Sequence, residues 1–217
     1  MQTAILVFDR LTALDAVGPY EVLRRAPGWK VQLVGPTEGV VRDERGALGL
    51  AADRSLDEVT DADILLVPGG IGTRPLMEDE QLLSWLREVD GRTKWTASVC
   101  TGSLLLGAAG LLDGKRATTH WLSLERLAEL GAIPVEERVV EDGKVITAAG
   151  VSAGIDMALR LVARELGSET ARRIQLSIEY DPEPPFDAGS PRKAPAEVVE
   201  AVTAAAARHD EWLRQRL

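Results

Sequence analysis

The chain has 217 residues, of which 45% are hydrophobic, and it carries a formal net charge of −9. This length suits one large globular domain, and the negative charge argues against nucleic-acid binding, because phosphates would be repelled over most of the surface. No run of about eighteen apolar residues occurs, so the sequence predicts no membrane span. The stretch MQTAILVFDR lacks signal-peptide features, and a single cysteine fits a reducing compartment, so we expect a cytoplasmic protein.

Short apolar runs alternate with helical patterns along the first half of the chain. Continuous apolar runs predict buried strands over 4–8, 30–35, 62–70 and 94–100. Helical spacing appears at 18–26 and 79–91, with Pro19 suited to a first turn and Gly91 to a C-terminal stop. This alternation implies an α/β fold in which a mostly parallel sheet carries helices on both faces.

The second half of the chain continues the pattern with turns and longer helices. We expect a hairpin in the first half of the chain at 39–53 and a second hairpin at 138–150. Helices at 152–167 and 168–180, a Pro-rich strap at 180–195 and a final helix at 196–217 are expected to follow. The second hairpin is expected to turn at Asp142-Gly143, and each of the first two helices is expected to open with a serine N-cap. We predict a single domain over 1–217.

The only cysteine, Cys100, stands where a predicted strand ends and a small-residue helix begins. A free cysteine is often a small buried hydrophobic residue, and burial alone would explain it. Its position favours another interpretation, because the unpaired N–H groups at a helix start stabilise a thiolate. The context also resembles the strand–turn–helix elbow that exposes a nucleophile at the top of an α/β sheet. We therefore predict a reactive thiol.

Asp15 and the glycines of VPGG also follow predicted strands, as Cys100 does. The carboxyl ends of parallel strands meet at one edge of a sheet, where ligands bind. Asp15 is either a functional carboxylate at this edge or only the N-cap of the helix that follows, because an N-cap needs no more than a carboxylate oxygen. Glu21, one turn later, fits a solvated helical residue.

The two histidines do not form a metal site with the cysteine. His120, beside Trp121 at a strand end, fits a packed and hydrogen-bonded residue, whereas His209 in the final helix fits a solvated one. One cysteine and two distant histidines provide no zinc-binding spacing, so no metal is expected.

Two glycine runs invite a nucleotide-binding interpretation, and both lack the required pattern. VPGGIGTRP has no G-x-G-x-x-G order, and GLLDGKR is too short for a Walker loop. We expect no cofactor. The bare backbone of Gly69, Gly70 and Ile71 is instead expected to hold a developing negative charge or to form a tight turn.

Five blocks spread over nearly the whole chain resemble the PfpI-like superfamily. They are LDAVGPYEVL, ILLVPGGIG, SVCTGSLLLGAAGLLDGKRATTHW, AAGVSAGIDMAL and EYDPEPPFDAGSP. The cysteine block and the proline-rich block are similar to those of the branch that hydrates isonitriles. The resemblance implies a flavodoxin-like fold like that of class I glutamine amidotransferases, a homodimer, and a cofactor-independent hydro-lyase. It implies Cys100 as nucleophile, Thr101 as its neighbour and Asp15 as the acidic partner.

The implied reaction adds water to an isonitrile and gives an N-substituted formamide. Cys100 would form a thioimidate, and Asp15 would act first as an acid and then as a base. An ionised Asp15 would repel a thiolate, so we expect the resting pair to share one proton. The remaining expected substrate-binding positions are Gly69, Gly70, Ile71 and His120.

Two departures and two alternative functions accompany the resemblance. PfpI-type proteases have a histidine directly after the cysteine, where this chain has Thr101, so peptidase activity is not expected. Ala149 stands where relatives often have glycine, which would narrow the site. The alternatives are a glyoxalase or deglycase that uses the same cysteine, and a non-enzymatic sensor whose cysteine is oxidised. The domain also resembles the sensor half of AraC-type transcription regulators, without their helix-turn-helix region.

Overall fold

The computed structural model describes the backbone of residues 1–214 and the side chains of residues 1–208. The chain divides into two units, Met1–Tyr180 and Asp181–Leu217. The first unit holds every position that the sequence singles out for catalysis or binding. The interpretation of the whole chain as a single domain stays a prediction.

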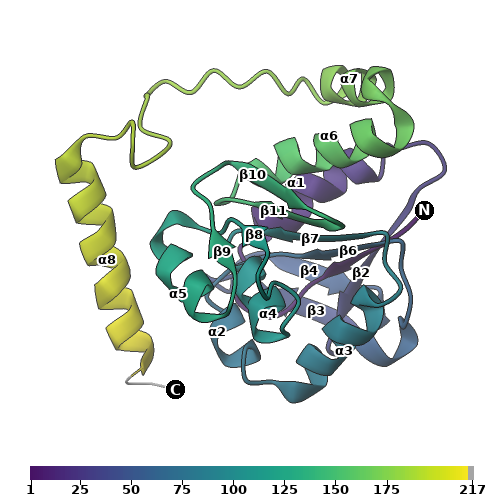
Figure 1. Cartoon of the computed structure of the whole chain (residues 1–217), viewed down its shortest axis with the longest axis horizontal. Coiled ribbons are helices and arrows are strands. Elements are labelled where there is room, and N and C mark those ends of the chain that lie inside the picture. The colour runs from purple at the N-terminus through teal and green to yellow at the C-terminus, as the bar shows by residue number, and fades with distance from the viewer. Residues whose placement is uncertain (215–217) are drawn as a thin grey trace. The chain divides into compact units, whose positions relative to one another are not determined.

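A seven-stranded sheet lies at the centre of the first unit, among the residues that the structure describes (Figure 1). Its spatial order is β10 (Val139–Asp142), β11 (Val145–Ala148), β7 (Trp95–Val99), β6 (Ile64–Val67), β1 (Gln2–Leu6), β2 (Lys30–Gly35) and β5 (Arg54–Ser55). Only β10 runs antiparallel to its neighbour in this sheet, so the predicted mostly parallel sheet is confirmed. The order reverses direction between β1 and β6, which is the place where flavodoxin-like sheets bind ligands.

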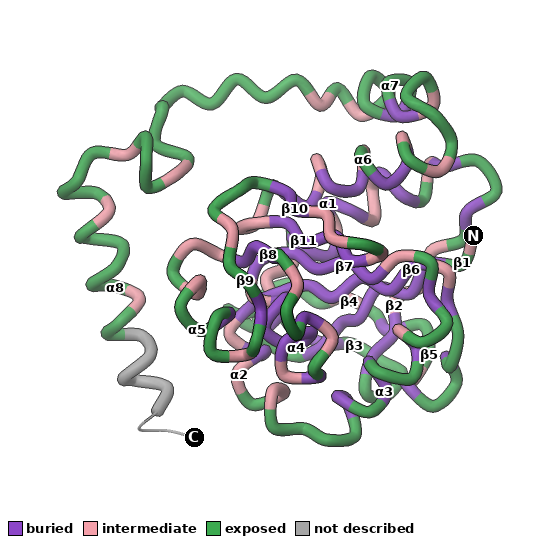
Figure 2. The backbone as a smooth tube through the Cα atoms, in the orientation of Figure 1, coloured by how far each residue is buried: buried purple, intermediate pink, exposed green. Residues whose placement is uncertain are grey.

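Helices cover both faces of the sheet (Figure 1). One face carries α1 (Ala13–Leu23), α6 (Ala153–Leu166) and α7 (Ser168–Ser177), and the other carries α2 (Thr73–Leu76), α3 (Glu80–Asp90), α4 (Gly102–Ala108) and α5 (Leu124–Glu129). Figure 2 shows that the buried residues concentrate in the strands between these layers. All four residues of β6 are buried, because a strand covered on both faces has no solvent-facing side.

Smaller elements complete the first unit. They are the antiparallel hairpin β3 (Gly39–Arg42) and β4 (Gly49–Ala52), the parallel pair β8 (Arg116–Ala117) and β9 (Ile133–Pro134), and the 3₁₀ turns η1 (Leu56–Glu58) and η2 (Trp121–Ser123). Both predicted hairpins are therefore present, one as β3–β4 and the other as β10–β11.

The first helix begins earlier than the sequence pattern predicts. It starts at Ala13 and places Pro19 in its interior, so the first-turn prediction for Pro19 is wrong. A proline in a helix removes one N–H donor. Here the ring is buried against α6, since a Cβ at Gly154 would lie only 3.0 Å from Pro19 Cγ. Packing between the two helices offsets the lost hydrogen bond.

One prediction about a turn and one about an N-cap are also wrong, and a second N-cap is confirmed in position only. The turn of the second hairpin is Gly143-Lys144, one residue later than predicted, because Asp142 pairs with Val145 and Gly143 adopts φ +63°. Ser152 occupies the N-cap of α6 without capping it, and its hydroxyl accepts a hydrogen bond from Arg138 instead. Helix α7 starts at Ser168 itself, and Gly167 is its N-cap.

The second unit contains an extended, mostly exposed segment over 181–195, followed by helix α8 (Ala196–Arg214). The last three positions of the predicted final helix and the side chain of His209 lie outside the described residues. Within residues 1–214, no helix combines the length and the apolar character needed to cross a bilayer.

The start of α4 depends on the absence of a side chain at Gly102. A Cβ at this position would lie 2.0 Å from the carbonyl oxygen of Val67. We expect Gly102→Ala to lower the free energy of unfolding by about 2 kcal/mol or more, because the backbone of β6 must move. Chemical denaturation measures this loss.

Gly91→Ala is the matched control. Its Cβ would lie 3.4 Å from the nearest atom, in ordinary contact, and Gly91 has the helical φ of −55°. We expect a change below about 1 kcal/mol for this variant. Equal losses in the two variants would contradict the close approach at Gly102.

Candidate active site

The backbone bends sharply at Cys100, between the end of β7 and the start of α4. Cys100 has φ +57°, a left-handed conformation that is uncommon for residues with a side chain. Its N–H donates to Ala148 O at 3.0 Å, and its carbonyl accepts from Thr119 Oγ1 at 3.0 Å and from Ser103 Oγ at 3.2 Å. These hydrogen bonds hold the strained residue in place, and the predicted elbow is confirmed.

Gly69 allows three segments to meet beside this elbow. A Cβ on Gly69 would lie 2.5 Å from Thr101 N and 2.9 Å from Asp15 Oδ2. Only glycine leaves room for the β6 end to touch both the elbow and the start of α1. The structure therefore brings Asp15 and Cys100 to the same edge, as the parallel topology predicts.

Asp15 lies inside the first turn of α1 and is fully buried. The N-cap of this helix is Thr12, so the interpretation of Asp15 as a cap is wrong. Its Oδ2 accepts a hydrogen bond from Gly69 N at 2.9 Å, while Oδ1 has no hydrogen-bond partner among the described residues. Burial raises the pKa of Asp15 from 3.8 to about 7, against the opposing effects of the Gly69 hydrogen bond and the Cys100 thiol.

Cys100 is 6% exposed, and its thiol is not stabilised as a thiolate in the resting protein. Burial raises the pKa of Cys100 well above its ordinary value, and the charge of Asp15 raises it further. Desolvation outweighs the favourable backbone and hydroxyl contacts of Thr101, so the helix start does not lower the pKa of Cys100. At neutral pH the pair retains at least one proton.

The N–H groups of the loop after β6 are already occupied. Gly69 N donates to Asp15, Gly70 N donates to Thr101 Oγ1 at 2.9 Å, and Ile71 N donates to Glu44 Oε1 at 3.1 Å. The loop therefore positions the side chains of Asp15 and Thr101, two of the predicted catalytic residues. Any direct contact of these N–H groups with substrate would require one of these bonds to open.

His120 lies at the start of η2, where its Nδ1 accepts from Leu122 N at 3.4 Å. Its ring packs 5.9 Å from that of Trp121, and a Cβ on Gly150 would lie 2.6 Å from His120 Cδ2. Partial burial lowers the pKa of His120, so the imidazole is neutral at pH 7. Within the described side chains, no group of three His, Cys, Asp or Glu residues is arranged to hold a metal ion.

Glu44 is a site-proximal residue that sequence reasoning missed. It lies in the loop between β3 and β4 and accepts hydrogen bonds from Thr12 Oγ1 at 3.0 Å and from Ile71 N. Its charge raises the pKa of Asp15, Cys100 and His120. An acidic residue in a polar hairpin turn gives no sequence signal of its own, because such residues are usually solvated.

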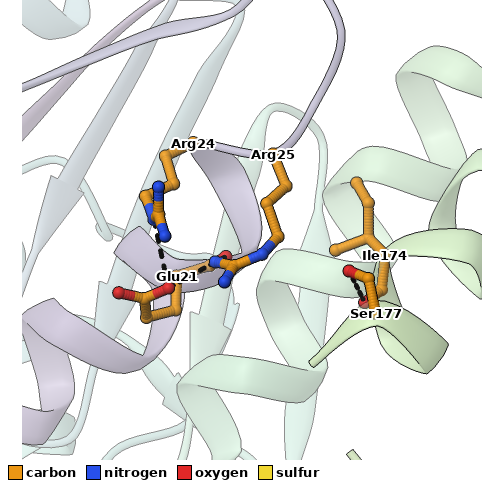
Figure 3. A network of polar contacts seen from close by, with 5 residues as sticks. All are labelled: Glu21, Arg24, Arg25, Ile174 and Ser177. Carbon is orange, nitrogen blue, oxygen red and sulfur yellow. Dashed lines mark hydrogen bonds and ion pairs between the residues drawn. The ribbon is translucent and has the colours of Figure 1, made fainter. Parts of the chain in front are cut away.

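Glu21, in contrast, forms ion pairs on the surface of α1. Its carboxylate pairs with Arg24 at 3.1 Å and with Arg25 (Figure 3). Hydrogen bonding to Arg25 lowers its pKa. Figure 3 also shows the end of α7, where Ser177 Oγ donates to Ile174 O at 2.8 Å. Glu21 is a helical surface residue, as expected.

The raised pKa of Asp15 makes stability depend on pH. In the unfolded chain Asp15 ionises near 3.8, whereas in the folded chain it stays protonated up to about 7. Folding stability therefore falls as pH rises between these values, by at most about 4 kcal/mol from this group. We expect Asp15→Asn to lack this loss, so that its stability relative to the parent protein increases from pH 4 to pH 8 in urea titrations. A difference that does not change with pH would contradict the burial of an ionisable Asp15.

Comparisons with known proteins agree with the fold and the elbow. Residues 1–164 match the model of the DJ-1/PfpI family. The chain is 48% identical over 200 residues to the isonitrile hydratase of Pseudomonas putida, covering 92% of this chain and 87% of that protein. It is also 32% identical over 178 residues to the HTH-type transcriptional regulator CdhR of Pseudomonas aeruginosa, covering 80% of this chain and 52% of that regulator.

Solved structures show the same relationship. A THiJ/PfpI family protein from Pseudomonas syringae superposes with a TM-score of 0.92 at 41% identity, covering 95% of this chain and 86% of that one. Drosophila melanogaster DJ-1beta shares the fold, with a TM-score of 0.73 at 24% identity, covering 82% of this chain and 97% of that one. The chain belongs to the DJ-1/PfpI family and is similar to an isonitrile hydratase.

Proposed function

We propose that this protein hydrates isonitriles to N-substituted formamides. The observation that carries the proposal is the buried Asp15 carboxyl, whose pKa is raised to about 7 and which lies beside the Cys100 thiol at a strand–helix elbow. A group with a pKa near the working pH both donates and accepts protons efficiently. The 48% identity to an isonitrile hydratase supports the same reaction.

The first step forms a carbon–sulfur bond. Cys100 sulfur attacks the terminal carbon of R–NC while the proton shared with Asp15 moves to the same carbon, which gives the thioimidate R–N=CH–S–Cys100. Asp15 is left ionised. A covalent route suits this substrate, because the isonitrile carbon accepts a thiolate more readily than neutral water.

The second step replaces sulfur by oxygen. The oxygen of a water molecule bonds to the thioimidate carbon while ionised Asp15 takes a proton from that water. Asp15 then passes the proton to the substrate nitrogen. Collapse of R–NH–CH(OH)–S–Cys100 breaks the carbon–sulfur bond, and the hydroxyl proton returns to Asp15. The products are R–NH–CHO and the starting Asp15–Cys100 pair, so the cycle needs no cofactor.

Thr101 supports this chemistry by fixing the elbow to the loop after β6. Its Oγ1 accepts from Gly70 N at 2.9 Å and donates to Gly70 O at 3.3 Å. A role for His120 in binding the R group is part of the proposal. The proposal also includes a homodimer and a cytoplasmic location, whose reducing conditions keep the one cysteine as a thiol.

Loss of the thiol should abolish turnover. We expect Cys100→Ala and Cys100→Ser to form no formamide from cyclohexyl isocyanide, while unfolding free energies stay within about 2 kcal/mol of the parent value. Formamide is measured by chromatography, and methylglyoxal is the parallel substrate for glyoxalase activity. An active alanine variant would rule out the covalent route, and lactate without formamide would favour the glyoxalase alternative.

Asp15→Asn tests the proton-transfer role with the geometry preserved. The asparagine carbonyl still accepts the Gly69 N–H, but the side chain can no longer exchange a proton. We expect kcat to fall about a hundredfold or more. Alkylation of Cys100 at several pH values provides the control, because the titration step near pH 7 should disappear with the carboxyl. A variant that keeps most of its activity and its thiol titration would contradict the role of Asp15.

A further inference from the structure

Glu44 is hydrogen-bonded to the two segments that carry or contact Asp15, namely the start of α1 and the loop after β6. Its Oε1 accepts from Thr12 Oγ1 at 3.0 Å, at the start of α1, and from Ile71 N at 3.1 Å, in the loop after β6. Glu44 itself is exposed, whereas Asp15 and Cys100 are buried. An exposed carboxylate is thus bonded to both segments that position Asp15.

The hydrogen bond from Thr12 to Glu44 takes the place of the usual side-chain cap bond at the start of α1. Thr12 is the N-cap of α1, yet its hydroxyl makes no cap bond to the helix and donates to Glu44 instead. Thr12 N donates to Gly69 O at 2.9 Å, so the same residue also ties the β1–α1 loop to the loop after β6. Glu44 therefore joins the β3–β4 hairpin to both loops of the site.

The carboxylate of Glu44 is not part of an ion pair within the described side chains. Among the described side chains, no Lys or Arg forms an ion pair with Glu44. The imidazole of His120 is neutral at pH 7 because burial lowers its pKa. The pKa values of Asp15 and Cys100 are both raised by the charge of Glu44, in addition to the effect of burial, so that charge reaches the reacting atoms.

We propose that Glu44 determines charge selectivity, so that the site favours isonitriles with uncharged R groups and disfavours those that carry a carboxylate. The inference rests on the proposed function and adds the substrate class to it. An exposed charge several ångströms away changes a rate constant for an anion by about threefold to tenfold at low ionic strength, and salt screens the effect.

The single cysteine allows a test that does not need isonitrile turnover. Iodoacetate and iodoacetamide alkylate the same thiol but differ by one negative charge. We expect Glu44→Gln, which keeps the acceptor oxygen for Thr12 and Ile71, to raise the iodoacetate-to-iodoacetamide rate ratio at Cys100 about threefold or more at low salt. The increase should shrink in about 1 M NaCl.

Glu88→Gln is the matched control. Glu88 is exposed near the end of α3 that leads into the start of β7, at the edge of the sheet opposite to the site, and it pairs with Arg92 at 3.2 Å. The substitution changes net charge by the same amount as Glu44→Gln. We expect this variant to have the same iodoacetate-to-iodoacetamide rate ratio at Cys100 as the parent protein. An unchanged ratio in Glu44→Gln, or a change that persists at high salt, would overturn the proposal.

Isonitrile kinetics extend the test to the substrate. The kcat/KM ratio of isocyanoacetate to its methyl ester should rise in Glu44→Gln by a factor similar to that of the alkylation ratio. A ratio equal to that of the parent would overturn the selectivity role. If the parent protein hydrates neither compound and also forms no formamide from cyclohexyl isocyanide, the proposed function fails, while the alkylation ratio still decides whether the charge of Glu44 reaches the thiol.

Discussion

The site depends on a close approach of backbones at the carboxyl end of β6. Gly102 and Gly69 leave no room for a side chain, since an added Cβ would lie 2.0 Å from Val67 O and 2.5 Å from Thr101 N, respectively. This contact presses the elbow against the strand and holds Cys100 at φ +57°. It also brings the elbow within reach of Asp15, whose carboxyl is bonded to Gly69 N. The positions of Asp15 and Cys100 thus follow from two missing side chains.

Burial of two acids beside each other determines the protonation state of the site. Desolvation raises the pKa of Asp15 to about 7 and that of Cys100 well above its ordinary value, so at neutral pH a proton remains in the pair. The same burial costs stability, because a carboxyl that ionises in the unfolded chain stays protonated in the folded one. The arrangement gives up some stability at neutral pH and keeps a proton in the buried pair. Such exchanges are typical of catalytic sites.

The sheet and the Asp15–Cys100 pair could be predicted from the sequence, because apolar runs mark buried parallel strands whose carboxyl ends meet at one edge. Features that depend on tertiary contacts could not be predicted from the sequence. The helix-start rule favours a thiolate at Cys100, but burial dominates its pKa. Pro19 is a helix-start signal in the sequence, yet packing against α6 places it mid-helix. Glu44 looks like a solvated turn residue until the fold brings Ile71 and Thr12 to its carboxylate.

The proposed reaction requires a covalent bond between the substrate and Cys100. Rapid mixing with cyclohexyl isocyanide followed by acid quenching and intact-mass spectrometry tests it most directly, because the thioimidate keeps every atom of the substrate. We expect a mass increase equal to one isonitrile molecule, located on the peptide that contains Cys100 and absent from Cys100→Ala. Formamide production with no adduct at any mixing time, and with the alanine variant still active, would contradict it.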